Sequence, residues 1–541
     1  MTVPVLEEAG DRQALDQPAA PATRGAPAPV WLWFAALLVL VPVAVPLAFL
    51  FADVLRATEA AREVLFDVRT VELLVRSVVF TAAVTASAVT IGVAAAWLTV
   101  RVDLQARAFW TVLIALPLVM PSYVIALTII SFNGPRGLFS DLTNVTLPAV
   151  SGFWGAWLAL TLSTYPYVFI VVRATLRRVD PALEEAARGL GASGWRAWRT
   201  ITLPQLRPAV GAGGLLVALY TLSDFGAVSL MRFDTFTRVI YAQYQGRIDR
   251  TPAAVLSVAL IILVLAILYF EGRSRGRGVY FTRRPNRTPE LITPTRGQSF
   301  FVYGFLGGLV MAALVLPVFV LVAWLLKGFA RGSGLDIPWG AIAGSLSGST
   351  AAAVLAMLAA LPVIILTVRY RSRASAWLDR GIYVVFSLPH ITVALAVVFF
   401  GATYLGPLYQ SFAILVMVYA VLFLAQATGP GGSALLQVNP HLEEASRGLG
   451  KSTEATIRRI TLPLMWRGLL AGGLLVWLTT MKELPATLLL RPTGFTTLAI
   501  RIWSSANELL YARAAVSALI LLVVSAVPMY LVVTRLQEQG R

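Results

Sequence analysis

Long apolar stretches, separated by short polar segments, run along almost the whole chain. A helix needs roughly 20 apolar residues to cross about 30 Å of hydrocarbon, and stretches of that length predict twelve membrane spans. The stretches are continuous rather than alternating, so each is expected to be a helix, which satisfies its own backbone hydrogen bonds, and not a barrel strand. The expected spans lie near residues 30–51, 72–100, 108–131, 152–176, 209–230, 252–271, 300–326, 345–368, 381–401, 408–428, 468–490 and 514–534.

The composition agrees with an integral membrane protein. Apolar residues make up 58% of the chain and charged residues 13%, whereas soluble domains are about 25% charged. These values exclude a cytosolic enzyme, a disordered chain and a soluble nucleic-acid binder. The net charge of +17 is therefore interpreted as loop charge that sets membrane orientation, and the lack of cysteine excludes disulfides and thiolate metal sites.

The charge pattern predicts the orientation and the division of the chain. Twelve spans place both termini on one side, and the segments on that side carry more Lys and Arg than the loops opposite, so both termini are expected in the cytoplasm. Residues 1–29 lack the pattern of a secretory signal and are predicted to be a disordered cytoplasmic tail. The remaining chain divides into a first half at 30–271, a basic cytoplasmic linker at 272–299 and a second half at 300–541.

The two halves repeat one another. Six spans return the chain to the side on which it began, so the second half is expected to insert in the same orientation as the first. The matching segments are 99–101 with 367–369, Pro121 with Pro389, 181–191 with 440–450, and 201–204 with 460–463.

The longest repeated segment lies between the fourth and fifth spans of each half, in loops 177–208 and 437–467. Each copy begins with a proline, which is tolerated in a first helical turn, and continues with two glutamates, which are favourable in that turn. A glycine then permits a helix end or bend, and the sequence Ile-x-Leu-Pro follows after nine more residues. A short docking helix outside the bilayer is therefore expected on the cytoplasmic side. The residues of the pattern are Glu184, Glu185, Ala186, Gly191, Leu203 and Pro204, and in the second copy Glu443, Glu444, Ala445, Gly450, Leu462 and Pro463.

This doubled pattern resembles the EAA loop of permease subunits of binding-protein-dependent ABC importers. The resemblance implies the all-α fold of type I importer permeases, with about twelve membrane helices in two homologous halves, in a multi-pass protein of the bacterial inner membrane. It also implies that each loop helix docks into an ATPase subunit, so two ATPase copies and a solute-binding protein are the expected partners. Ser446 stands where the family usually has alanine.

Two glycine patterns in the same loops imitate nucleotide sites. Residues 189–194 spell a dinucleotide fingerprint, but they follow a membrane helix, and the fingerprint requires a preceding strand. Residues 450–452 end like a phosphate-binding loop but lack its earlier glycine. We therefore expect a permease without catalytic residues, cofactor or stable metal site, and we expect ATP and magnesium to be bound by the partner ATPase.

Ionisable residues at membrane depth are candidates for the substrate pathway, because burying them there is costly. Asp224 in the fifth span and Glu483 in the eleventh occupy matching positions of the repeat, and two carboxylates beside a central path suit a hard cation. Lys482 could pair with Glu483 or offset its charge. The alternative is that both carboxylates form buried structural pairs or lie near the outer interface. His390, where the first half has Ser122, is interpreted as a packed or hydrogen-bonded residue and not as a ligand.

Two outer loops, 231–251 and 491–513, depart from the orientation rule because they are rich in arginine. Such positive charge would be explained if the loops met acidic patches on the two lobes of a solute-binding protein. Simple solvated loop charge is the alternative. The candidate docking residues are Arg232, Arg238, Arg491 and Arg501.

Ferric iron is the expected substrate, on resemblance. Residues 481–492 are similar to the C-terminal half of ferric-iron permeases, and residues 223–226 are similar to the matching segment of that group. Related thiamine permeases carry a comparable acidic-Phe-Gly pattern, so thiamine and polyamines remain alternatives, and bare and chelated iron are both open. A secondary carrier would have no use for two ATPase-docking helices, and the motifs of a membrane enzyme are missing.

Overall fold

The computed structural model describes residues 28–135, 137–246, 248–274, 291–332 and 336–538. The predicted tail at 1–29, apart from its last two residues, and most of the predicted linker at 272–299 lie outside these ranges. Helices make up most of the described chain, and the bridge between extended residues found there joins Val102 to Ile292. The predicted all-α fold is confirmed.

The first half contains long helices with short ones between them. Its elements are α1 (Val30–Arg56), α2 (Thr58–Phe66), α3 (Val68–Arg101), α4 (Arg107–Ala115), the 3-10 turn η1 (Leu116–Val119), α5 (Ser122–Phe132), α6 (Leu138–Thr143), α7 (Gly152–Leu176), α8 (Pro181–Gly189), α9 (Gly194–Ala197), the π turn η2 (Trp198–Thr202), α10 (Leu203–Ser223), α11 (Gly226–Leu230), α12 (Phe236–Gly246) and α13 (Thr251–Ser274).

The second half repeats this order from α16 onward. Its elements are α14 (Arg296–Val310), the π turn η3 (Met311–Val315), α15 (Leu316–Ala330), α16 (Trp339–Val368), α17 (Arg373–Ser387), α18 (His390–Tyr404), the 3-10 turn η4 (Gly406–Leu408), α19 (Phe412–Leu422), α20 (Leu424–Gln437), α21 (Pro440–Gly448), α22 (Thr453–Thr456), the π turn η5 (Ile457–Thr461), α23 (Leu462–Met481), α24 (Pro485–Leu490), α25 (Leu498–Asn507) and α26 (Tyr511–Glu538).

The long helices agree with the predicted number of crossings. Among the described residues, 8 helices are long and apolar enough to cross a membrane, and 3 bent helix pairs could each add one more. The helix α26 stands at the position of the twelfth predicted span and is apolar over Tyr511–Ala526. The described helices therefore agree with about twelve membrane crossings.

Three of the predicted spans are broken into two helices. The segment Arg107–Val119 meets α5 at 91°, α17 meets α18 at 99°, and α19 meets α20 at 51°. At the first two breaks, Pro121 and Pro389 precede the new helix, and a proline disfavours helical backbone in the residue before it. Met120 and Leu388 are accordingly extended, with ψ of 124° and 143°. No proline stands at the third break.

The fifth and eleventh predicted spans are also not continuous. The helix α10 ends at Ser223 and α23 ends at Met481, and the short helices α11 and α24 follow after non-helical residues. Asp224 and Glu483 lie in these two breaks, not inside an unbroken helix as the hydrophobic pattern suggested.

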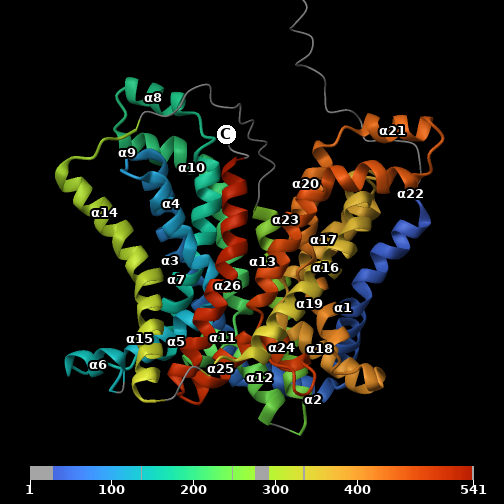
Figure 1. The fold of residues 1–541 in the computed structure, drawn as a ribbon, viewed down its shortest axis with the longest axis horizontal. Helices are drawn as coiled ribbons and strands as arrows, with labels where there is room; N and C mark the ends of the chain where they lie inside the picture. The colour runs from blue at the N-terminus through green and yellow to red at the C-terminus, as the bar shows by residue number, and fades with distance from the viewer. Residues whose placement is uncertain (1–27, 136, 247, 275–290, 333–335, 539–541) are drawn as a thin grey trace, which may run out of the picture.

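The first helix of each half packs against the other half (Figure 1). The helix α1 contacts α16 and α18, whereas α14 contacts α4 and η3 contacts α7. Trp324 of α15 donates from Nε1 to the carbonyl oxygen of Ser131 in α5, at 3.3 Å. Lys327 reaches Asp141 in α6, at 2.5 Å. Each half of the fold therefore contains a helix supplied by the other half of the sequence.

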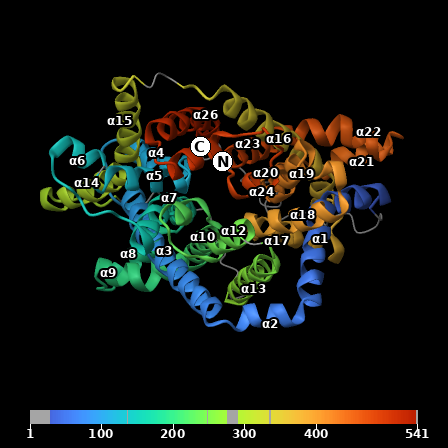
Figure 2. The ribbon, with the colours of Figure 1, turned by 90° about the horizontal axis from the view of Figure 1, so that it is seen from below.

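The short helices are sorted to the two ends of the molecule. The repeated loop helices α8, α9, α21 and α22 lie at the end drawn uppermost in Figure 1, which we call the loop end. The helices α2, α6, α12 and α25 lie at the opposite end, which faces the viewer in Figure 2. Both views place α8 and α21 on opposite sides of the molecule.

Candidate functional site

The repeated loops contain the short helices that the sequence predicts. Asp180 and Asn439 cap α8 and α21, because their side chains accept hydrogen bonds from the backbone N–H groups of Ala182 and His441, both at 3.0 Å. Glu184 and Glu443 lie in the first turn of each helix. The docking-helix prediction is therefore correct at the level of local structure in both halves.

Gly191 and Gly450 end these helices in the left-handed backbone region, with φ of 89° and 76°. In each copy the glycine N–H and the N–H of the next residue bond back to the last turn of the helix, at 2.9–3.2 Å. This is the Schellman arrangement, in which glycine is favoured because a side chain is unfavourable at positive φ. The glycines thus fix where each loop helix ends.

The first-turn glutamates of α8 and α21 each contact an arginine and a threonine of the same half. Arg369, at the end of α16, approaches both carboxylate oxygens of Glu443 with its Nε at 3.1 Å, and the Thr461 hydroxyl donates to the same carboxylate at 3.0 Å. Glu184 has the matching partners in the first half: Arg101, at 3.6 Å, and the hydroxyl of Thr202. These pairs fasten each loop helix to a long membrane helix.

The bracing arginines and threonines were not identified from the sequence. The sequence nevertheless marks these residues, because each lies in a segment that both halves repeat. Residues 99–101 match 367–369, and residues 201–204, which include Thr202, match 460–463, which include Thr461. The repeat marked these residues as shared by both halves, but it did not show that they meet the glutamates.

Several other residues of the two loop helices face solvent. Glu185 and Glu444 are exposed, as are Ala186 and Ala445, and His441 contacts Glu444 at 2.9 Å on this surface. Apolar side chains also stand out from the loop end, with 90% of Leu190 and 81% of Leu449 exposed; Leu183 and Leu442 are exposed as well. Exposed apolar side chains grouped with charges are typical of a protein-binding surface.

The departure at Ser446 is matched by a second difference between the halves. Ser446 and Thr456 are buried and their hydroxyls lie 3.0 Å apart, so each satisfies the other. In the first half the corresponding positions are Ala187 and Ala197. The two polar substitutions therefore form a pair, which explains why a hydroxyl is tolerated there.

Leu203-Pro204 and Leu462-Pro463 begin the long helices α10 and α23. Each follows a π turn, η2 or η5, and each proline stands in the first turn of its helix. A proline lacks the N–H that a regular helix would bond to the preceding turn, which favours such a local irregularity. The short helices α9 and α22 therefore continue through these turns into the membrane helices α10 and α23.

Asp224 is buried at the break between α10 and α11. One of its oxygens accepts hydrogen bonds from the N–H groups of Ala227 and Val228, at 3.0 and 3.3 Å, and the other accepts from the hydroxyl of Ser122. The Thr237 hydroxyl donates to the Asp224 carbonyl at 2.6 Å. The carboxylate therefore caps α11 and ties it to the start of α5.

Glu483 has the same role in the second half, with a different partner. One oxygen accepts from the N–H of Ala486 at 3.1 Å, which caps α24, and the other lies 2.8 Å from Nδ1 of His390 at the start of α18. His390 thus stands where the first half has Ser122, and both side chains meet the carboxylate of their own half. This geometry matches the alternative of buried structural pairs.

Lys482 does not pair with Glu483. Its Nζ instead donates to the carbonyl oxygen of Leu118 in the first half at 3.1 Å, and the Tyr123 hydroxyl donates to the Lys482 carbonyl at 3.4 Å. In the ranges that the structure describes, no three His, Asp or Glu side chains come together as a metal site. Asp224 and Glu483 accordingly belong to two separate hydrogen-bonded pairs.

The arginines of the outer loops differ in their surroundings. Arg238 is paired with Asp234, and Arg501 with Asp336 at 2.6 Å. Arg491 donates to the carbonyl oxygen of Phe495 at 3.5 Å. Among the described residues, the guanidinium of Arg232 has no ion pair.

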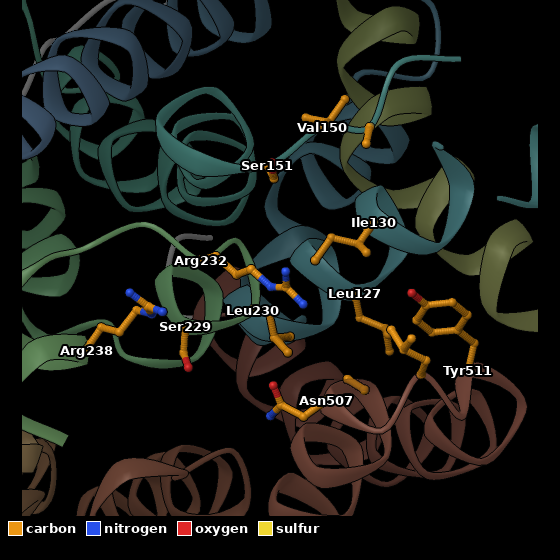
Figure 3. Close-up of a pocket in the computed structure, with 13 residues that line it drawn as sticks. Leu127, Ile130, Val150, Ser151, Ser229, Leu230, Arg232, Arg238, Asn507 and Tyr511 are labelled. Carbon is orange, nitrogen blue, oxygen red and sulfur yellow. The ribbon is translucent and has the colours of Figure 1, made fainter. Parts of the chain in front are cut away.

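A pocket of about 400 Å³ lies beside Arg232 at the opposite end (Figure 3). Its walls come from α5, the segment before α7, α11, the start of α12, and residues 506–511 of the second half. The guanidinium of Arg232 and the ring of Tyr511 point into it from its two sides. The pocket therefore lies where the two halves meet.

Both halves of the chain match one family. Residues 88–270 and 361–539 each match the family described as the inner membrane component of binding-protein-dependent transport systems. The chain belongs to this family. Each match contains one repeated loop, its bracing arginine and one carboxylate break, whereas the exchanged helices α1, α14 and α15 lie outside both matches.

Named relatives support the same assignment. The chain is 33% identical over 512 residues to the Fe(3+)-transport system permease protein FbpB 2 of Haemophilus influenzae, across 93% of this chain and 98% of that protein. It is 33% identical over 187 residues to the molybdenum transport system permease protein ModB of Escherichia coli, across 32% and 82% of the two chains. It is 26% identical over 185 residues to the sulfate transport system permease protein CysT of Escherichia coli, across 33% and 66%.

These matches confirm the predicted permease of a binding-protein-dependent importer, with two fused copies of the permease domain. With its long apolar helices, this family member is a multi-pass protein of the inner membrane. Membership implies a solute-binding protein and an ATPase as partners.

Proposed function

We propose that this chain is the permease subunit of an ATP-driven importer that takes ferric iron from a solute-binding protein and releases it into the cytoplasm by alternating access. The main support is similarity to a ferric permease along nearly the whole length of both chains. The molybdenum and sulfate permeases match about a third of this chain, so they support the transporter class more than the substrate.

The loop end is proposed to face the cytoplasm and to bind two copies of the ATPase, one at α8 and one at α21. The exposed glutamates and leucines of both helices support this role. ATP and magnesium would be bound by the ATPase, since neither glycine pattern of these loops stands in the structural context of a nucleotide site. Both termini would then be cytoplasmic.

The solute-binding protein is proposed to dock at the opposite end, on the arginine-rich loops around α12 and α25. Arg491 supports this role because it has no acidic partner within the described ranges. Arg238 and Arg501 each have an acidic neighbour, Asp234 and Asp336, which lowers the net charge that they offer to a partner. Steering by this surface would weaken as salt screens it.

The central path is proposed to pass Asp224, Lys482 and Glu483. Lys482 supports this placement, because it reaches from one half to the other, and the two carboxylates stand at matching breaks. Their hydrogen bonds to the helix ends give them a structural role as well. Weak and transient contact with a passing cation is all that transport requires, since the binding protein would provide the affinity.

The test of the proposed function is uptake by the reconstituted complex. The permease, its ATPase and its binding protein are placed in proteoliposomes, and the binding protein is loaded with labelled ferric iron. We expect iron uptake that requires ATP and stops when an ATPase variant that cannot hydrolyse ATP is used. ATP-dependent uptake of thiamine or a polyamine, with no uptake of iron, would move the substrate to that alternative.

Neutral variants separate the pathway role of the carboxylates from their capping role. Asp224→Asn and Glu483→Gln keep an oxygen that can cap α11 and α24 but remove the charge. If the charge attracts the substrate, we expect iron uptake to fall about tenfold in the double variant, equivalent to about 1.4 kcal/mol, with assembly intact. Normal uptake and normal ATP turnover in the double variant would assign both carboxylates to structure alone.

A further inference from the structure

The pocket in Figure 3 has the chemistry of an anion site. The side chains that carry charge or hydrogen-bonding groups are Arg232, Arg238, Ser151, Ser229, Asn507 and Tyr511, and no Asp or Glu is among the lining residues. Arg238 is partly neutralised by Asp234, which lies outside the lining. The charge that remains uncompensated belongs to Arg232, an exposed guanidinium without an ion pair in the described chain.

The backbone beside the pocket gives a second, independent indication. Arg232 has a φ of 54° and ends α11 in a Schellman arrangement, in which its N–H bonds to the Ser229 carbonyl at 3.1 Å and the Phe233 N–H bonds to the Val228 carbonyl at 3.0 Å. Glycine is the favoured residue there, and both loop helices of this chain use it, at Gly191 and Gly450.

The second half contributes the same kind of helix end to the same pocket. Leu509 has a φ of 60° and ends α25, with hydrogen bonds from its own N–H and that of Leu510 to the carbonyls of Ala506 and Ser505, at 3.1 and 2.8 Å. Two residues with side chains therefore occupy an unfavourable backbone region and line one pocket. Such strain is concentrated at functional positions in proteins, because a side chain is needed there.

The position of the pocket suits a substrate-related ligand. It lies at the end opposite to the loop helices, and α11, which forms one wall, is the helix that Asp224 caps. The segment before α7 is held against this wall because the Gly152 N–H donates to the Met231 carbonyl at 2.7 Å. A volume of about 400 Å³ is within the range that holds small molecules and exceeds the needs of a single ion.

We propose that this pocket binds a small polyanion of the polycarboxylate or oxyanion class, with Arg232 as its principal contact. The ligand would be either a free anion or the anionic shell of a chelated ferric ion, and a bare cation would be repelled. Only the second source, a chelated ferric ion, rests on the proposed function of iron import. Planar guanidinium groups bind carboxylates and oxyanions through two parallel hydrogen bonds, which favours arginine over lysine here.

The test is equilibrium binding to the purified complex of the permease with its ATPase in nanodiscs. The probes are citrate, ferric citrate and sulfate, measured by calorimetry at low and high salt. The key variant is Arg232→Gly, which removes the guanidinium and also supplies the residue that the backbone favours. We expect it to keep or raise the thermal stability of the complex while it weakens citrate binding at least about tenfold.

Two further variants sharpen the result. Arg232→Lys keeps the charge without the paired hydrogen bonds, so an intermediate loss is expected. Arg331→Gly removes an exposed arginine at the end of α15, outside the pocket lining, and is expected to leave binding unchanged. Wild-type binding should also weaken with salt, because Arg232 is exposed.

The probes distinguish the sources of the anion. Tighter binding of ferric citrate than of citrate or sulfate, lost in Arg232→Gly, would identify an anionic iron chelate as the ligand. Equal binding of the three, with the same loss, would identify a general anion site. No binding by the wild-type complex, or binding unchanged in Arg232→Gly, would overturn the proposal.

Other results point to a different role. If Arg232→Gly slows association of the binding protein while citrate, ferric citrate and sulfate do not bind, the arginine is a docking residue and the anion site is wrong. Since the binding measurement needs neither ATP nor a loaded binding protein, failure of iron uptake with intact anion binding would count against the proposed function alone.

Discussion

Replacing Gly191 and Gly450 together by valine is expected to abolish the stimulation of ATP hydrolysis by loaded binding protein. Both glycines hold the ends of the loop helices at positive φ, where a residue with a side chain costs about 1–2 kcal/mol and a β-branched one more. A Cβ added at either position would meet no atom within 4 Å, so the damage is confined to the backbone bend. Membrane insertion should survive, because the cost is local.

The control for this experiment lies on the same two helices. Gly189 and Gly448 are the last residues of α8 and α21, have no positive φ and also have open space around a Cβ. Valine at these two positions adds the same bulk without disturbing the bend. Stimulation of ATP hydrolysis by loaded binding protein should therefore be largely kept. ATPase assays in proteoliposomes compare the two pairs. Normal stimulation in the Gly191 and Gly450 variant would refute the proposal that these helices transmit the signal of the loaded binding protein to the ATPase.

Removing the charge of Glu443 is expected to loosen the second loop helix from the membrane domain. In Glu443→Gln, Arg369 loses its counter-charge in a site where both side chains are only 12–13% exposed, and breaking such a largely buried pair costs up to about 3 kcal/mol. The unfolding temperature of the complex and the stimulation of its ATPase activity by loaded binding protein should both fall. The matching change Glu184→Gln should have a smaller effect, because Arg101 lies 3.6 Å from that carboxylate.

Two variants test whether the pair itself is responsible. Glu444→Gln removes a neighbouring charge that is exposed and contacts His441, so it should leave thermal stability unchanged even if it weakens ATPase binding. The double variant Arg369→Glu, Glu443→Arg swaps the two charges and should recover part of the stability that each single variant loses. A double-mutant cycle measures this recovery. If Glu443→Gln and Glu444→Gln shift the unfolding temperature equally, the ion pair between Arg369 and Glu443 does not stabilise the protein.

The repeated loops show how the sequence could predict local structure in detail. A proline, two glutamates and a glycine at fixed spacing predicted a short capped helix, and α8 and α21 have that form. Helix caps and ends depend on interactions within a few residues of the chain, so their residue types are visible in sequence. Duplication of the pattern made a chance occurrence improbable.

The breaks in the membrane spans show where the hydrophobic pattern was insufficient. Apolar residues continue through the breaks at Pro121 and Asp224, so hydrophobicity alone predicted one helix in each place. Proline explains the first break locally. At Asp224 the break is stabilised by Ser122, which is distant in the chain, and by the N–H groups of α11.

By itself, the sequence determined the membrane class, the approximate number of membrane helices, the doubled architecture and the two repeated loop helices. These features depend on the length of apolar stretches and on backbone preferences of residues that are close together in sequence. The tertiary structure alone decided the exchange of α1 and α14, the pairing of Arg369 with Glu443 and of His390 with Glu483, and the pocket at Arg232. These features depend on contacts between residues far apart in sequence, and such contacts form only when the helices pack against one another.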